Sequence, residues 1–257
     1  MISLRSGHAT VTVDAVNGGR LAALEVAGQQ LLIGHKPEHG PMHWGSYPMV
    51  PWAGRVRHGR FTFDGRQYDL PLDMPPHAIH GTAYRRPWHV DAVAYDEMAM
   101  SCDLAWELGG RAWQRIAVAD TAVTCVLGVV AGDRAMPAEI GWHPWFTKPL
   151  ALRFRPDAMY ARDDEGIPTG ELVRPSAGPW DDCFVNTEPV ELRYADLTVT
   201  VMSDCDHWVV FDEPPHATCV EPQSGPPDAF NLNPSVLEPG GQLVRAMRIS
   251  WDDLWDR

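Results

Sequence analysis

The sequence lacks a basic character and any long apolar run. Lysine and arginine total 21 against 34 aspartate and glutamate, which gives a formal net charge of -13. Phosphate backbones and anionic membrane surfaces attract basic proteins, so this charge argues against nucleic acid and against a membrane as partners. The longest nearly apolar run, TAVTCVLGVVA at 121–131, is too short and too polar to cross a bilayer.

Paired cysteines and a secretory signal are also missing. The five cysteines, Cys102, Cys125, Cys183, Cys205 and Cys219, are scattered and form no CxxC pair. Such a set argues against a disulfide framework and against a zinc site, so we expect reduced thiols. The first residues, MISLRSGHATVTVDAV, alternate between apolar and polar side chains and do not form the apolar core of a signal peptide. We therefore expect a cytoplasmic protein.

Helical periodicity is absent as well, since no segment of about twelve residues or more keeps a helical spacing of apolar side chains. Period-two alternation, which is typical of half-buried strands, recurs instead in runs such as ATVTVDAV, WQRIAVAD and LTVTVMS. Turn signals such as NGG at 17–19 and PGG at 239–241 separate these runs. No composition break marks a linker. The sequence therefore predicts one all-β domain over residues 1–257, most simply a large antiparallel β-sandwich.

Several stretches interrupt this alternation and are rich in proline, histidine, tryptophan and glycine. We predict that they form long loops on rigid sheets, where binding and catalytic residues tend to lie. The stretches cover residues 34–59, 72–88, 141–149, 174–184 and 221–234.

Two of these stretches fix a titratable side chain in front of a proline. In EIGWHPWFTKP, His143 lies between Trp142 and Trp145, and Pro144 restricts its backbone to extended geometry. In VEPQSGPPDAFN, Glu221 is likewise followed by proline. Taken alone, a histidine among aromatic rings is more often a core residue, and a glutamate at a strand end is more often solvated. A functional interpretation therefore depends on further partners.

Five motifs, in order along the chain, resemble those of the aldose 1-epimerases, also called galactose mutarotases. PMVPWAGRVRHGRFTFDGRQYDLP resembles the N-terminal segment of that family, HAIHG its His-Gly motif, GWHPWF its His-Pro-Tyr-Phe motif, DDCF its aspartate loop and VEPQSGPPDAFN its glutamate motif. The resemblance implies a galactose mutarotase-like supersandwich. It also implies an isomerase that interconverts the α and β anomers of a free aldose, with a sugar as its partner and with no cofactor or metal. The oligomeric state stays undefined.

Anomer exchange requires two proton transfers, because the anomeric hydroxyl must lose a proton while the ring oxygen gains one. One base and one acid, held apart, are therefore needed, and a carboxylate and an imidazole suit these roles. The resemblance makes Glu221 the base and His143 the acid. It also makes His80 a third catalytic group, which binds sugar hydroxyls and stabilises charge on the ring oxygen. His77 lacks the following glycine of the motif and is expected at the loop surface.

The resemblance also implies residues that bind the sugar. Arg55 matches the arginine of the family and offers several donors to adjacent hydroxyls. Gly54 stands where the family usually has asparagine, which leaves the sugar preference open. Asp181 matches the sugar-binding aspartate if DDCF is aligned on Asp-x-x-Phe, while Asp182 and a structural turn after Pro179 remain alternatives.

The tryptophans that flank the histidine have two possible roles. Trp142 and Trp145 either stack on the sugar or only support His143, since tryptophan rings serve both purposes. Gln223 lies close to the glutamate of the same motif and is a further candidate for the substrate-binding site.

A hexose-6-phosphate mutarotase is the main alternative among enzymes. It would require a basic clamp beyond the ring site, for which Arg57, Arg60 and the Arg85-Arg86 pair are the available arginines. A phosphate carries close to two negative charges and needs several aimed donors, whereas the motif loops of this chain are acidic. The sequence therefore favours a neutral sugar.

Two alternatives come from other classes. A non-catalytic sugar-binding module would have lost the acid or the base, and the presence of both argues against it. A metal-dependent cupin-like enzyme is suggested by the HxxH of His77 and His80. That spacing does not place both rings on one face of a strand or loop, so the metal alternative has little support.

Overall fold

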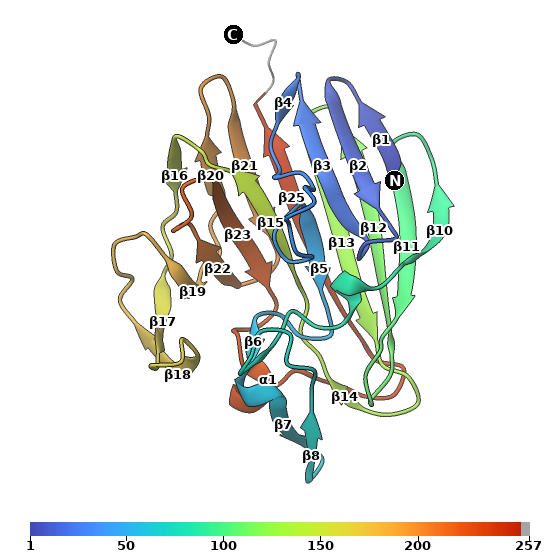
Figure 1. The fold of residues 1–257 in the computed structure, drawn as a ribbon, viewed down its shortest axis with the longest axis vertical. Helices are drawn as coiled ribbons and strands as arrows, with labels where there is room; N and C mark the ends of the chain where they lie inside the picture. The colour runs from blue at the N-terminus through green and yellow to red at the C-terminus, as the bar shows by residue number, and fades with distance from the viewer. Residues whose placement is uncertain (253–257) are drawn as a thin grey trace.

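The computed structural model describes residues 1–252, and within them two large antiparallel sheets pack face to face (Figure 1). The strands of the first sheet are β1 (Ile2–Ser6), β2 (Ala9–Asp14), β3 (Arg20–Val26), β4 (Gln29–Gln30), β5 (Ser46–Met49), β15 (Gly141–Thr147), β17 (Ala158–Arg162), β18 (Pro168–Val173), β19 (Asp181–Val185), β22 (His207–Phe211) and β23 (Ala217–Gln223). Their order is β1-β2-β3-β5-β15-β23-β22-β19-β17-β18, and β4 pairs with β3. The last residues of the predicted domain, 253–257, lie outside the described part of the chain.

The second sheet covers one face of the first. Its strands are β10 (His89–Val93), β11 (Glu97–Asp103), β12 (Arg111–Ala119), β13 (Ala122–Val130), β16 (Ala151–Arg153), β20 (Val190–Arg193), β21 (Thr198–Ser203) and β25 (Gln242–Trp251). They follow the order β10-β11-β12-β13-β25-β21-β20-β16. Strand β25 therefore lies at the centre of the sheet, between β13 and β21.

Short elements complete the described chain. They are the strands β6 (Arg55–Val56), β7 (Arg60–Phe63), β8 (Arg66–Asp69), β9 (Ala78–Ile79), β14 (Met136–Pro137) and β24 (Val236–Leu237), the helix α1 (Ala229–Leu232) and the 3-10 turns η1 (Arg57–Gly59) and η2 (Ala83–Arg85). In Figure 1 the labels of β6, β7, β8, β14 and α1 gather at the lower end of the sandwich. Arg55 lies on β6, and His80 directly follows β9, which pairs with β6.

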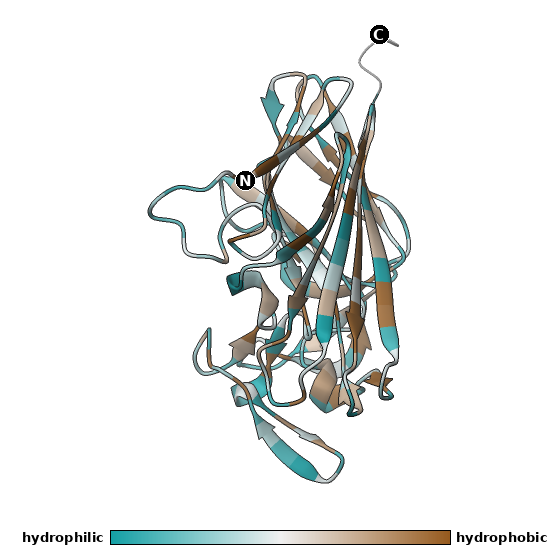
Figure 2. Ribbon diagram, turned by 90° about the vertical axis from the view of Figure 1, so that its right-hand side faces the viewer, coloured by the Kyte–Doolittle hydropathy of each residue, from teal (hydrophilic) through white to brown (hydrophobic). Residues whose placement is uncertain are grey.

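Alternation along the strands explains why they form two packed layers. In β12, Ala112, Ile116 and Val118 are buried while Arg111 and Arg115 are exposed, as expected for a strand with one face in a core. Figure 2 shows the result as alternating hydrophobic and hydrophilic bands along the strands. The predicted all-β sandwich is therefore confirmed. Among the described residues, no helix is both long enough and apolar enough to cross a membrane.

The two faces of the first sheet have different surroundings. Trp142 and Val220 belong to the large core between the sheets. Trp145, Cys219 and Tyr47, from the same or neighbouring strands, form part of a smaller apolar cluster. Successive residues of a strand point to opposite faces, so this smaller cluster lies on the face that the second sheet does not cover.

The predicted loops are where the sequence interpretation was wrong. Four of the five stretches contribute strands to the first sheet, namely β5, β15, β19 and the end of β23. Pro48, Pro144 and Pro222 lie inside these strands, where each removes one backbone donor. Proline is unusual in a strand with neighbours on both sides, and this chemistry made the segments look irregular. All five cysteines are buried free thiols, as expected.

Candidate active site

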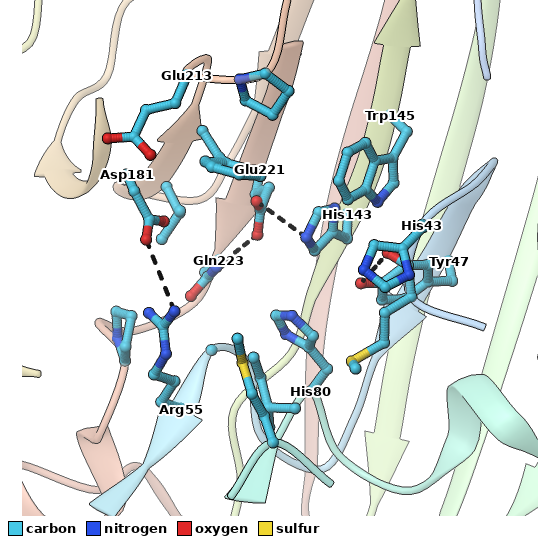
Figure 3. A pocket seen from close by; sticks show the side chains of 18 of the residues that line it. His43, Tyr47, Arg55, His80, His143, Trp145, Asp181, Glu213, Glu221 and Gln223 are labelled. Carbon is cyan, nitrogen blue, oxygen red and sulfur yellow. Dashed lines mark hydrogen bonds and ion pairs between the residues drawn. The ribbon is translucent and has the colours of Figure 1, made fainter. Parts of the chain in front are cut away.

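A pocket of about 670 Å³ opens on the uncovered face of the first sheet (Figure 3). Strands β15, β19, β22 and β23 provide its floor, and Arg55 and His80 reach it from segments beyond the sheet. This volume falls in the range of small-molecule sites, roughly 300–1,000 Å³.

The floor of the pocket holds a buried carboxyl and a buried imidazole in contact. Tyr47 is opposite His143 in the β5–β15 pair, and Val209 is opposite Glu221 in the β22–β23 pair. The pairing of β15 with β23 places His143 and Glu221 side by side, and Nε2 of His143 lies 3.2 Å from Oε1 of Glu221. The residues are only 6% and 2% exposed. The sequence interpretation expected the acid and the base to be held apart, whereas they are at hydrogen-bond distance.

Burial shifts both groups toward their neutral forms. It lowers the pKa of His143 to about 3, with smaller contributions in the same direction from His43 and Arg20. Burial also raises the pKa of Glu221 well above its ordinary value, and the Asp181 carboxylate raises it further. A desolvated charge is costly, which explains both directions. These directions favour a neutral His143 and a protonated Glu221, so that the pair holds one proton between its two members.

His80 points toward the same pair from the loop after β9. Its ring is perpendicular to that of His143, with the centroids 5.0 Å apart. The backbone of His80 has φ 61°, and its N–H donates to the carbonyl of Gly54. Gly81 follows with φ +74°, and a Cβ there would lie 2.0 Å from the carbonyl oxygen of Val50. Only glycine fits this position, which gives the His-Gly motif a physical reason.

Arg55 and Asp181 form an ion pair at one side of the pocket (Figure 3). The Nη2 atom of Arg55 lies 3.7 Å from Oδ2 of Asp181, and both residues line the pocket. Asp182, the alternative in the sequence, is not among the lining residues and pairs with Nε of Arg162 at 2.8 Å. The structure thus brings Asp181 to the pocket and leaves Asp182 outside it.

Gly54 departs from the family pattern for a steric reason. Its φ is +63°, and a Cβ at this position would lie 2.7 Å from Cβ and Cγ of Pro227. An asparagine would therefore require Pro227, which also lines the pocket, to move.

The two tryptophans beside His143 have different positions. The ring of Trp145 is nearly parallel to that of His143 at 5.4 Å and lines the pocket. Trp142 does not: it is 1% exposed in the inter-sheet core, and its Nε1 donates to Oε1 of Gln114. This placement removes Trp142 from the direct sugar contacts and leaves it as a support from below. Gln223 lines the pocket, and its amide donates to Oε2 of Glu221 at 3.4 Å.

Sequence reasoning did not identify Tyr47 as part of the site. Its ring stacks on His143 with the centroids 4.9 Å apart, and the guanidinium carbon of Arg20 lies 5.1 Å from the centroid of the Tyr47 ring. Tyr47 is completely buried. The pairing of β5 with β15, which places Tyr47 opposite His143, reveals this role. The sequence alone does not give that pairing. His43 and Glu213 also line the pocket without having been predicted.

The arginines considered for a phosphate clamp are engaged elsewhere. Arg57 contacts Asp163 and Glu165, each at 2.5 Å. Arg60 pairs with Asp69 at 2.9 Å, and Arg85 pairs with Asp73 at 2.6 Å. None of these arginines, nor Arg86, is among the residues that line the pocket.

The HxxH histidines do not converge on a common point. Nδ1 of His77 accepts a hydrogen bond from the backbone N–H of His58, while His80 faces the pocket. Among residues 1–252, the atoms that could hold a metal ion cluster at one place, formed by His143, Cys219 and Glu221.

Two packed antiparallel sheets with a pocket on the open face of one of them define the galactose mutarotase-like fold. The sequence model of the family "Aldose 1-epimerase" matches residues 1–250, and the chain belongs to that family.

The chain is also similar to a curated protein in sequence and to solved structures in fold. The chain is 26% identical over 271 residues to "Uncharacterized protein YihR" of Escherichia coli strain K12, covering 92% of this chain and 87% of the relative. A galactose mutarotase-like protein from Clostridium acetobutylicum has a similar structure, with a TM-score of 0.86 and 16% identity over 98% of this chain and 94% of that one. The galactose 1-epimerase of Lactobacillus acidophilus NCFM matches with a TM-score of 0.82 and 14% identity, over 96% and 92% of the two chains. At these identities the structures support the fold alone.

Proposed function

We propose that this protein is an aldose 1-epimerase that interconverts the α and β anomers of a free aldose. The observation that carries the proposal is the contact between the carboxyl of Glu221 and the imidazole of His143 at the floor of a pocket of small-molecule size. Membership of the aldose 1-epimerase family supports the same reaction class.

The contact distance suits the chemistry of the anomeric centre. The hydroxyl that loses a proton and the ring oxygen that gains one are bonded to the same carbon, so base and acid must lie close together. In ring opening, Glu221 removes the hydroxyl proton while His143 delivers a proton to the ring oxygen. The bond from the anomeric carbon to the ring oxygen breaks and the carbonyl forms. Rotation about C1–C2 and the reverse transfers then close the ring on its other face.

The proton balance of the pair fits this cycle. Before ring opening the pair holds one proton, which is on His143, and Glu221 is ionised. After ring opening the pair still holds one proton, which is now on Glu221, and His143 is neutral. Burial favours the neutral arrangement, while the charge of Arg55 lowers the pKa of Glu221 and favours its ionised form. Ring opening therefore starts from the less stable, ionised arrangement, which Arg55 supports, and the two groups exchange their roles between opening and closing.

The other pocket residues hold the sugar in this proposal. His80 binds a hydroxyl near the ring oxygen and stabilises the charge that develops there. Arg55 and Asp181 bind adjacent hydroxyls from one side of the pocket, and Gln223 orients the carboxyl of Glu221. Trp145 offers an apolar surface to the sugar and is held in place by stacking on His143.

A neutral aldose is the proposed substrate. Arg55 is the single arginine or lysine among the pocket-lining residues of the described chain, and it already faces Asp181. Glu213 adds a further acid to the rim. A phosphate group would meet these carboxylates without a clamp of several donors.

Two expectations from the sequence remain proposals. A single domain over residues 1–257 is supported by the family match over 1–250. A cytoplasmic location is supported by the five free thiols, since reduced cysteines are typical of that compartment.

Polarimetry over a panel of sugars tests the proposed function. Freshly dissolved α-glucose, α-galactose and glucose 6-phosphate would be followed to equilibrium with and without the full chain. We expect the protein to accelerate the approach to equilibrium for at least one free aldose. A folded protein that accelerates none of the free aldoses would overturn the proposal.

A further inference from the structure

A third potential ligand lies beside the proposed acid and base. Cys219 precedes Glu221 by two residues on β23, so both side chains point to the same face. Its cross-strand partner on β15 is Trp145, two residues after His143. The donor atoms of His143, Cys219 and Glu221 all lie within 4.8 Å of one another.

The proposed reaction gives the thiol of Cys219 no role. It is completely buried within the small apolar cluster of the pocket face. A thiol, an imidazole and a carboxylate nevertheless form a ligand set that suits Zn²⁺, which binds sulfur at about 2.3 Å and nitrogen or oxygen at about 2.0–2.2 Å. Ligand atoms of a tetrahedral zinc ion are roughly 3.5 Å apart. His143 and Glu221 are already 3.2 Å apart, so the thiol of Cys219 is the group that would have to approach, by about 1 Å at most.

The position of the cluster leaves one coordination site open. His143 and Glu221 line the pocket, so an ion between them would face the pocket on its fourth side. Three protein ligands with one open position are the arrangement of a reactive rather than a closed structural zinc site. An ion there would also neutralise the thiolate and carboxylate charges that burial otherwise disfavours.

We propose that His143, Cys219 and Glu221 form an inhibitory site for Zn²⁺ or a similar thiophilic divalent cation. The binding site stands on the geometry of the three ligands, whereas the inhibition rests on the proposed function. A bound ion takes the lone pair of His143 and the carboxylate of Glu221, so neither can exchange a proton with the sugar. Mg²⁺ prefers oxygen ligands and near-octahedral geometry, and it does not bind here.

Cobalt substitution tests the binding site without any assay of activity. Co²⁺ would be titrated into the full chain, and the near-ultraviolet band of thiolate-to-cobalt charge transfer would be followed. We expect this band to saturate near one equivalent and to be absent in Cys219→Ala. Cys183→Ala is the matched control, because Cys183 is also buried, lies in the same sheet and is outside the cluster. Cys219→Ser serves as the near-isosteric second variant if the alanine variant does not fold.

The outcomes of this titration are decisive. No thiolate band in the wild-type chain, or an undiminished band in folded Cys219→Ala or Cys219→Ser, would overturn the proposed site. Loss of the band in folded Cys183→Ala would show that Cys183 provides the thiolate ligand. That result would also overturn the proposed site.

Inhibition is then measured with the mutarotation assay. We expect Zn²⁺ to inhibit, Mg²⁺ to have no effect, and a chelator to restore the full rate. Relative to its own uninhibited rate, Cys219→Ser should require at least about tenfold more Zn²⁺ for half-inhibition. Activation of the metal-free chain by Zn²⁺ would contradict an inhibitory site. A cobalt band in a chain that turns over no aldose would leave the binding site intact and would refute the proposed function.

Discussion

The two faces of the first sheet differ in chemistry although the same strands build both. Toward the second sheet, β15 and β23 present Trp142, Phe146 and Val220, which are buried in the large core. Toward the pocket, the same strands present His143 and Glu221. Neighbouring residues of one strand therefore belong to different faces, one to the core and the next to the pocket. The sandwich therefore keeps its stability and its chemistry on opposite sides of one sheet.

The tryptophans on the strands of the first sheet follow the same division in their hydrogen bonds. On the core face, Nε1 of Trp142 donates to Gln114, and Nε1 of Trp208 donates to the carbonyl of Cys205. On the pocket face, Nε1 of Trp145 and Nδ1 of His143 are buried and have no partner among the described residues. Unpartnered buried polar atoms cost stability, roughly 1–3 kcal/mol each. The pocket face thus keeps polar atoms that lower the stability of the folded protein.

The largest expected effect separates the two tryptophans of β15. Trp142→Ala should reduce the free energy of unfolding by about 3–5 kcal/mol, because it leaves a cavity in the inter-sheet core and removes the donor to Oε1 of Gln114. Trp145→Ala, on the pocket face, should cost less stability but reduce kcat/KM more. Urea denaturation and mutarotation assays measure the two effects. A greater loss of stability in Trp145→Ala, or a greater loss of kcat/KM in Trp142→Ala, would show that the two faces do not have separate roles.

Removal of the acid or the base should affect activity and not folding. Glu221→Gln and His143→Asn should each lower the mutarotation rate by at least about a hundredfold. The thermal midpoint should not fall in Glu221→Gln, since the amide removes a carboxyl that is costly to ionise at this buried position. Near-normal turnover in either purified and folded variant would refute the assignment.

Substrate charge should have a smaller effect. We expect kcat/KM for glucose or galactose to exceed that for glucose 6-phosphate by about tenfold, which corresponds to ~1.4 kcal/mol. The reason is that Asp181 and Glu213 line the pocket while Arg57 and Arg85 are paired outside it. A tenfold preference for the phosphate that is lost in Arg57→Ala or Arg85→Ala would show that a clamp does form.

The smallest expected effect is the response to pH, measured in the presence of a chelator. The pair gains a second proton only as pH falls through the pKa of His143, about 3, and loses its one proton only as pH rises through the raised pKa of Glu221. We therefore expect kcat/KM to fall by no more than about twofold as the pH is lowered from 7 to roughly 5. An ordinary histidine, with a pKa near 6.5, would instead give a clear fall below neutral pH.

The fold followed from the sequence wherever alternation was regular. Strands such as β12 and β21 carry apolar and polar side chains in turn, and this period alone identifies them. It failed where proline interrupts a paired strand. Pro144 and Pro222 remove backbone donors beside His143 and Glu221, so the segments that build the site were interpreted as loops.

The site was predicted residue by residue but not as a geometry. The motifs pointed to His80, His143 and Glu221, and the structure brings all three to one pocket. The contact between the acid and base depends on the pairing of β15 with β23, which are distant in the sequence. Trp142 was predicted as a possible sugar contact because sequence proximity does not reveal which face a side chain occupies. Tyr47 was missed for the same reason.

Exchange spectroscopy at equilibrium tests the central claim most directly. In this measurement, nuclear magnetic resonance follows the transfer of magnetisation between the α and β anomeric protons of glucose or galactose. The proposed mechanism predicts exchange cross-peaks that grow with the concentration of the wild-type chain, with no other product. It also predicts that the chain carrying both Glu221→Gln and His143→Asn gives no more exchange than buffer. The absence of exchange with the folded wild-type chain for every free aldose tested, or exchange that survives in the double variant, would contradict it.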